Sequence, residues 1–176
     1  MITAVSWTLA EILAGGSSLI GTEQIDFNHP SVEQYGEPRL NLYCYDLREN
    51  QQTQYSSQQT GGTNNDNGSL MWFDVSFLVS AWDCTALGEQ QLLSEALTLL
   101  LRHRFLPEEL LAPALRGYGM LPIRVSASGL IDTIAFWSAL GVPLRPALYV
   151  TVTVPLNLQG ESSMPEQNML LIHRSK

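Results

Sequence analysis

Apolar and polar side chains alternate most clearly over residues 71–81, in the sequence MWFDVSFLVSA. The same alternation occurs over residues 40–45, 121–125 and 148–154. A period of two is typical of half-buried β-strands. The pattern therefore predicts four core strands, the first two along the chain paired antiparallel and the last ended by a proline. A short additional strand is expected over residues 24–27.

Apolar residues at helical spacing predict three helices. The first covers residues 3–14, and we expect Gly15-Gly16 to end it in the left-handed conformation that favours glycine. The second contains the Leu-rich run 92–101, which is apolar around much of its circumference. Such a helix is either deeply sandwiched or also covers a subunit contact, and we favour sandwiching. A third, short helix covers residues 130–140 and stops at Gly141.

These elements indicate an α/β protein of the α+β type, built on one mostly antiparallel sheet of four to five strands. The N-terminal helix and the Leu-rich helix pack on this sheet. The chain has 176 residues and 45% hydrophobic content, and a domain of this size buries roughly 70% of the surface its unfolded chain exposes. We expect one domain over residues 1–156 and an extended C-terminal tail over 157–176. Within the domain, residues 49–69 have almost no apolar side chain to offset ordering entropy, so a mobile loop is expected.

The charge balance narrows the possible partners. The formal net charge is −8, with only nine Lys and Arg residues, so a basic patch that neutralises a nucleic-acid backbone is hard to assemble. The N-terminal segment lacks the positive region of a signal peptide. The longest apolar stretch falls short of the roughly 20 residues needed to cross a bilayer. We therefore expect a cytoplasmic protein that has no membrane span and binds no nucleic acid.

Residues able to carry reaction chemistry are scattered. His29, His103 and His173 have no partner at the spacing of a metal site, and the glycine-containing segment 16–22 lacks the lysine of a phosphate loop. We expect no catalytic, metal or cofactor site, and hence no enzyme. Two free, buried thiols are expected at Cys44 and Cys84, since disulfides rarely persist in the cytosol.

A few polar and aromatic residues on the strands need explaining. Asp74 lies in an otherwise apolar strand, so its carboxylate must face solvent or be paired. Trp72, Trp82 and Tyr149 fall on the less apolar strand faces or at strand ends. Either a second core layer made by the first two helices or a neighbouring subunit covers them, and we favour the core layer.

The polar tail carries one apolar run, Met169, Leu170, Leu171 and Ile172, followed by Arg174. A β-prone segment at the end of a polar spacer suits strand addition to another chain. It equally suits a tail that folds back onto its own domain. Both possibilities remain open at this point.

Four segments, taken in order and spacing, resemble one family. They are LYCY at 42–45, FLVSAW at 77–82, LLSEAL at 92–97 and LRPAL at 144–148. Together they are similar to the tail-terminator, or cap, proteins of phage-tail-like contractile injection systems. The resemblance runs from the first helix to Leu156 and is weakest in the polar loop and the tail.

The resemblance implies a tail-terminator-like fold and a structural role as the cap of an injection system. Such a cap forms a homo-oligomeric ring, expected to be a hexamer, that ends the inner tube and docks the last sheath layer. Its partners would be further copies, the sheath protein and the inner-tube protein. We place the contacts with these partners at Trp72, Trp82, Arg145, Met169, Leu170, Leu171, Ile172 and Arg174.

Two rival functions remain. The chain could be an adaptor or baseplate component of the same machine. It could also be a small-molecule or peptide-binding domain in which Trp72, Trp82 and Trp137 line a pocket.

Overall fold

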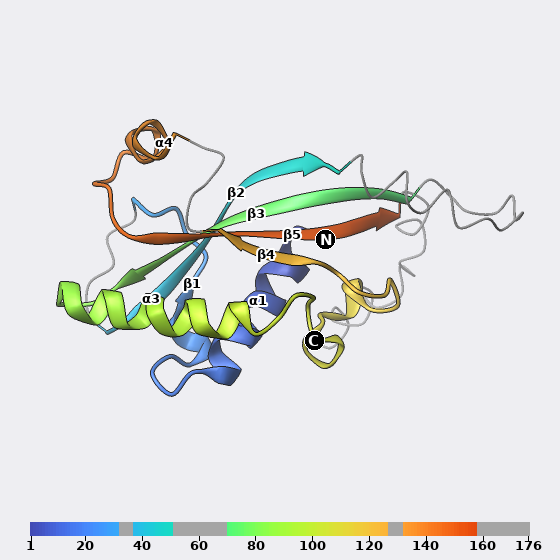
Figure 1. The fold of residues 1–176 in the computed structure, drawn as a ribbon, viewed down its shortest axis with the longest axis horizontal. Coiled ribbons are helices and arrows are strands. Elements are labelled where there is room, and N and C mark those ends of the chain that lie inside the picture. The colour runs from blue at the N-terminus through green and yellow to red at the C-terminus, as the bar shows by residue number, and fades with distance from the viewer. Residues whose placement is uncertain (32–36, 51–69, 127–131, 158–176) are drawn as a thin grey trace, which may run out of the picture.

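The computed structural model describes residues 1–31, 37–50, 70–126 and 132–157, and within these ranges five strands form one sheet (Figure 1). Their order is β1 (Ile25–Asp26), β2 (Arg39–Glu49), β3 (Leu70–Trp82), β5 (Ala147–Asn157) and β4 (Ile123–Ser126). β1 runs parallel to β2, and every other neighbouring pair is antiparallel. The predicted α+β fold with a mostly antiparallel sheet is confirmed, as is the antiparallel pairing of β2 with β3.

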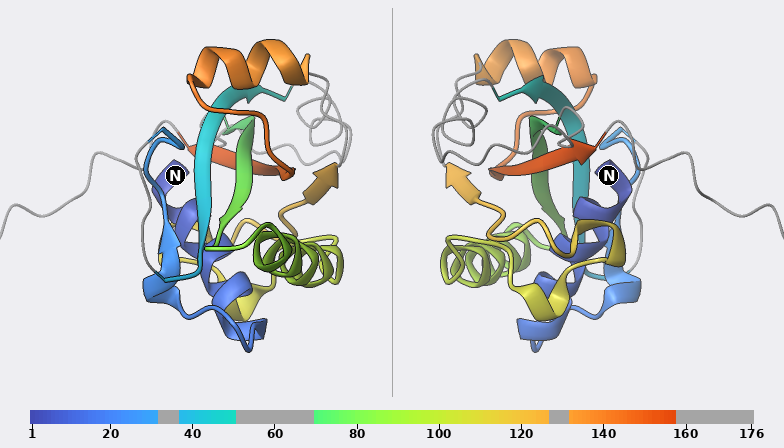
Figure 2. Two further views of the ribbon diagram at one scale, coloured as in Figure 1. Left: turned by 90° about the vertical axis from the view of Figure 1, so that its left-hand side faces the viewer. Right: turned by 90° about the vertical axis from the view of Figure 1, so that its right-hand side faces the viewer.

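Helices cover the two faces of the sheet unequally (Figures 1 and 2). α1 (Ile2–Gly16) and α3 (Ala86–Leu101) lie together on one face, whereas α4 (Thr133–Leu140) lies on the other, over one end of the sheet. The remaining half of that second face carries no helix in the described part of the chain. The sheet is therefore the middle layer of the domain at one end and an outer layer at the other.

Two hydrophobic clusters follow from this arrangement. The larger lies between the sheet and the pair α1 and α3, and the inward-facing residues of β3 and β5 form its floor. The smaller consists of Leu78, Trp137, Leu140 and Tyr149 and lies under α4. Of the three aromatic residues expected under a second core layer, only Tyr149 lies in this cluster, whereas Trp72 packs against the larger one. α4, and not the first two helices, covers Tyr149.

The end of α1 differs from the prediction. Gly15 and Gly16 are the last two helical residues, and Ser17 follows in an extended conformation with φ −93°. A Cβ on Gly16 would overlap the side chain of Leu99, while nothing lies within 4 Å of a Cβ on Gly15. Gly16 therefore lets α1 approach α3 closely and does not serve as a left-handed cap. That conformation is found at Gly141, with φ 69°, at the predicted end of α4.

α3 is an outer helix, and the prediction that it is sandwiched is wrong. It begins after Thr85, whose hydroxyl oxygen accepts a hydrogen bond from the Gly88 N–H at 3.0 Å. Its central leucines are buried, but Leu87 is 75% exposed and Leu101 is 60% exposed. Exposed apolar side chains thus lie at both ends of the helix.

β5 continues through Pro155 to Asn157, two residues beyond the predicted end. The Thr153 N–H donates to the Pro122 carbonyl at 2.9 Å, on the β4 side of the strand. Alternate residues of a strand direct their main-chain groups to the same side. The main-chain nitrogen of Pro155 therefore points to that side too. It lies beyond the end of β4, whose first residue is Ile123. A proline is tolerated there because no ladder bond is lost.

The limits of the expected loop and tail shift slightly. Glu49 is the last residue of β2, and the Asn50 N–H donates to the Trp72 carbonyl at 2.7 Å, so the strand pair extends to this point. Residues 51–69 of the expected loop lie outside the described residues. Asn157 belongs to β5, and residues 158–176 of the expected tail also lie outside. None of the described helices has the length and apolar character to cross a membrane.

Both cysteines are free, but their surroundings differ. Cys44 is partly buried and packs against the larger core cluster, and burial raises the pKa of its thiol. Cys84 is exposed in the connection between β3 and α3, so the prediction of a buried thiol is wrong at this position.

Candidate partner-binding surfaces

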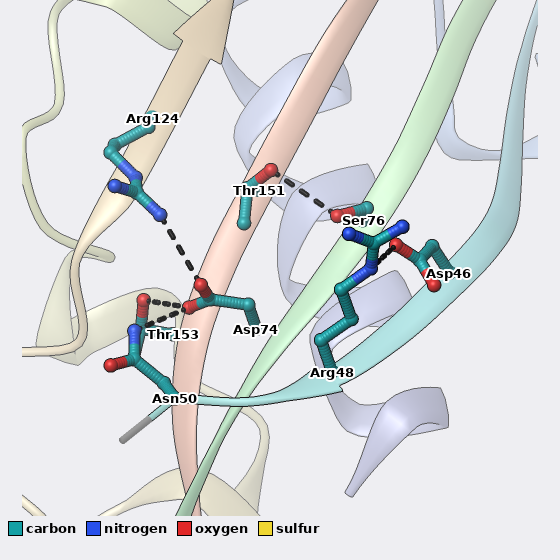
Figure 3. A network of polar contacts seen from close by, with 8 residues as sticks. All are labelled: Asp46, Arg48, Asn50, Asp74, Ser76, Arg124, Thr151 and Thr153. Carbon is teal, nitrogen blue, oxygen red and sulfur yellow. Dashed lines mark hydrogen bonds and ion pairs between the residues drawn. The ribbon is translucent and has the colours of Figure 1, made fainter. Parts of the chain in front are cut away.

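The half of the sheet that α4 leaves open carries a network of polar side chains (Figure 3). A β-bulge creates part of it. The register of β2 shifts so that Cys44 lies opposite Phe77 and Asp46 lies opposite Ser76. Tyr45 therefore packs toward α4, and Asp46, the next residue, lies on the same face. The strict alternation read from the sequence ends at this bulge.

Asp74 is the centre of the network. Its Oδ1 accepts hydrogen bonds from the Thr153 hydroxyl at 2.6 Å and from the Asn50 side-chain amide at 2.9 Å. Its Oδ2 lies 3.3 Å from Nη2 of Arg124 on β4. The expectation that this carboxylate must be exposed or paired is met by pairing. The Asp74 side chain on β3 therefore connects this strand to β5, to β4 and to the residue that follows β2.

Two further polar contacts extend the network across the sheet. Ser76 and Thr151 place their hydroxyl oxygens 3.3 Å apart, and Arg48 Nε lies 2.6 Å from Asp46 Oδ2. A face of short polar groups and paired charges suits a polar contact with another chain, because protein interfaces contain direct hydrogen bonds and bridging water molecules. No helix in the described ranges covers this half of the face.

Trp82 and Arg145, both predicted as partner contacts, lie against each other. The Arg145 guanidinium stacks 3.7 Å from the centroid of the Trp82 ring. Its Nη1 also lies 3.3 Å from Glu89 Oε1 and donates to the Ala81 carbonyl at 3.4 Å. This cluster connects the end of β3, the first turn of α3 and the segment before β5. A partner that binds here meets a preformed arrangement of the two residues.

Trp72 lies at the other end of β3, half-buried, and packs against the larger core cluster. Trp137 is 1% exposed within the smaller cluster. The three tryptophans therefore do not line a common pocket, contrary to what the ligand-binding alternative requires. A shallow groove between α3 and the start of β5 contains none of them; its lining is Gln90, Leu93, Ser94, Leu97, Pro146, Ala147 and Leu148.

An open strand edge was not anticipated from the sequence. β1 pairs only with Leu40 and Asn41 of β2, so residues 42–48 have no strand partner on that side within the described ranges. An unpaired edge offers a row of main-chain groups to an incoming strand. Periodicity could not reveal it, because the pattern of a strand is the same whether its edge is covered or not. Met169, Leu170, Leu171, Ile172 and Arg174 lie outside the described residues, and their role as contacts stays a prediction.

The sequence matches the family model described as the Pvc16 N-terminal domain over residues 4–170. The chain belongs to this family. Together with two solved terminators that share its fold, this membership in the Pvc16 N-terminal domain family supports the resemblance to terminators of contractile injection systems. None of the curated proteins matches the sequence significantly.

Two solved structures share the fold of this Pvc16 N-terminal domain. One is the sheath/tube terminator of PVC, an extracellular contractile injection system, in the extended state. It is 19% identical, with a TM-score of 0.66 over 97% of this chain and 65% of that one. The other is the tube-terminating cap of the anti-feeding prophage. It is 20% identical, with a TM-score of 0.59 over 94% of this chain and 58% of that one. This chain thus spans less than two thirds of either terminator.

Proposed function

We propose that this protein is a structural cap that ends the tube of a contractile injection system. The observation that carries the proposal is the match of 97% of the chain to the fold of a sheath/tube terminator. The described residues contain no cluster of three or more His, Cys, Asp or Glu side chains able to hold a metal ion. The role that we propose is mechanical and not enzymatic.

A closed ring suits this role. We propose that copies of the chain assemble as a homo-oligomer, a hexamer by inheritance from the family, on the last layer of the inner tube. A ring that matches the rotational symmetry of a polymer leaves no open subunit surface on which a further layer could grow. Tube protein and sheath protein are the proposed partners, and the assembled particle is the proposed location.

The sheath contact would use strand addition. The proposed donor is the apolar run 169–172 of the tail, with Arg174 beside it, reaching the last sheath layer. The polar half-face around Asp74 and the Trp82–Arg145 cluster are the proposed surfaces for the tube and the neighbouring copy. Residues 42–48 of β2 offer an edge that could receive a strand in return.

The end of the particle at which the protein lies tests the cap proposal. We expect a gold label on a tagged copy to mark the end opposite the baseplate, and loss of the protein to give tubes of irregular length. Electron micrographs of purified particles measure both. A label at the baseplate end would instead establish the adaptor alternative.

A truncation tests the tail. Deletion of residues 168–176 should leave a folded protein whose sheath docking is impaired, because the apolar run is removed and the domain is intact. Deletion of residues 175–176 alone is the matched control and should dock normally. Particles with normal length and full sheath occupancy from the longer truncation would remove the tail from the mechanism.

A further inference from the structure

The two ends of α3 carry opposite charge beside exposed apolar side chains. At its C-terminal end, Arg102 and Arg104 are exposed. Neither has an ion pair within the described ranges, in contrast to Arg48, Arg124 and Arg145. We call this the basic end of α3. It also includes Leu101, which is 60% exposed, and Phe105, which is 40% exposed.

The other end of α3 is acidic and apolar. Asp83 lies just before the helix, and hydrogen bonds from the main-chain N–H and the hydroxyl of Thr85 lower the pKa of its carboxyl. Leu87 in the first turn is 75% exposed, and Leu144 is 60% exposed. Leu144 precedes Arg145, whose guanidinium contacts Glu89 of α3, so it belongs to the same end. Asp83, Leu87 and Leu144 form the acidic end of α3.

The two ends cannot neutralise each other within one chain. α3 has 16 residues, and at about 1.5 Å per residue the ends are roughly 24 Å apart. Screening at physiological salt reduces interactions beyond about 8 Å. Each end is therefore available to another molecule. Figure 1 shows the helix on the outer side of its layer, with one end at the edge of the molecule.

The overall charge favours a contact at the basic end. With a net charge of −8, two copies repel each other unless the contact places a cation against an acid. The arginines beside α3 can supply that cation without breaking an existing ion pair. The apolar residues on both ends would lose solvent exposure in the same contact.

We propose that neighbouring copies dock head to tail, the acidic end of α3 in one copy against the basic end in the next. The inference rests on the proposed ring and names the surface that closes it. A contact between two different surfaces is heterologous, and such contacts generate rings when the rotation closes. Every copy then uses both ends, so no unpaired end remains in the ring.

Two charge changes test the contact in the full-length protein. Leu87→Lys adds a cation to the acidic end at an exposed position, and Arg102→Glu with Arg104→Glu reverses the basic end. Ile134→Lys is the matched control, because Ile134 is 74% exposed on α4, on the opposite face of the sheet. Mass photometry across a concentration series measures assembly. We expect each variant to need a roughly 100-fold higher concentration than wild type, and the control to assemble normally.

Mixing the two variants separates a lost contact from a damaged fold. In the mixture, the acidic end that carries the added lysine meets the basic end that carries the two glutamates. The two unmodified ends meet each other, so assembly is expected to return. Unfolded chains could not complement one another in this way. A restored species of only two chains, assembly of either variant at wild-type concentrations, or a mixture that stays dissociated overturns the head-to-tail contact.

Purified inner tubes separate this inference from the cap function. If both variants assemble at wild-type concentrations and bind tube ends as wild type does, the α3 contact is wrong and the cap function stands. If only the Arg102 and Arg104 variant fails, the basic end binds an acidic segment of another protein, and the contact between copies is again wrong. Wild-type protein that neither self-associates nor binds tubes removes both proposals.

Discussion

The side chain of Leu99 fills the space that a Cβ on Gly16 would need. Leu99 is 6% exposed and belongs to the larger core cluster, so it has little room to move. The last turn of α1 and the last turns of α3 therefore meet at a position where only a hydrogen atom fits. The contact fixes how closely the two helices lie on their shared face of the sheet.

Gly16→Ala should destabilise the protein by about 1–3 kcal/mol, because overpacking against Leu99 outweighs the better helix propensity of alanine. Gly15→Ala is the matched control. Nothing lies within 4 Å of its added Cβ, so propensity alone should stabilise by up to about 1 kcal/mol. Urea unfolding of both variants measures whether each substitution raises or lowers the stability. Equal effects from the neighbouring glycines would show that Leu99 yields freely.

The contacts of Asp74 predict an uneven response to mutation. Asp74→Ala leaves the Thr153 hydroxyl without its acceptor at a residue that is 4% exposed, and this should cost about 1–3 kcal/mol. Arg124→Ala should cost less than about 1 kcal/mol, because the arginine side chain is 68% exposed. Chemical denaturation compares the two variants. If both lost the same stability, the ion pair and not the buried hydrogen bond would organise this face.

The two thiols should react at different rates. Cys84 is exposed, whereas Cys44 is partly buried and burial raises the pKa of its thiol. A raised pKa lowers the thiolate fraction at neutral pH, and the thiolate is the reactive form. Labelling with a disulfide reagent should therefore show a fast and a slow phase. Cys84→Ser should remove the fast phase, and loss of the slow phase instead would reverse the assignment.

Local patterns in the sequence predict the strands and helices well but not their arrangement. Alternation identifies β3 and most of β2 and β5, because each buries one face against α1 and α3. The position of β5 between β3 and β4 depends on contacts between distant segments, which periodicity does not encode. The bulge after Cys44 is equally hidden, since a single extra residue leaves no mark on composition.

The candidate surfaces could likewise be predicted only in part. Asp74 could be singled out because a carboxylate in an apolar strand needs a partner, yet Thr153, Asn50 and Arg124 come from three separate segments. Arg102 and Arg104 follow α3 in the sequence, where the negative end of the helix dipole favours basic residues. Their lack of an ion pair in the described part of the chain is visible only once the neighbouring carboxylates are placed.

Trp82 and Arg145 come from distant parts of the sequence, and their stacking offers a measurable coupling. A double-mutant cycle of Trp82→Ala and Arg145→Ala should give about 1 kcal/mol of interaction energy, the usual range for a partly desolvated cation–π pair. A second cycle with Glu89→Ala and Arg145→Ala measures the neighbouring ion pair. In high salt, screening should weaken the Glu89 coupling and leave the Trp82 coupling largely unchanged, since the stacked surfaces exclude solvent. A Trp82 coupling near zero would mean that the arginine is held by Glu89 and the Ala81 carbonyl, with the ring only filling space beside it.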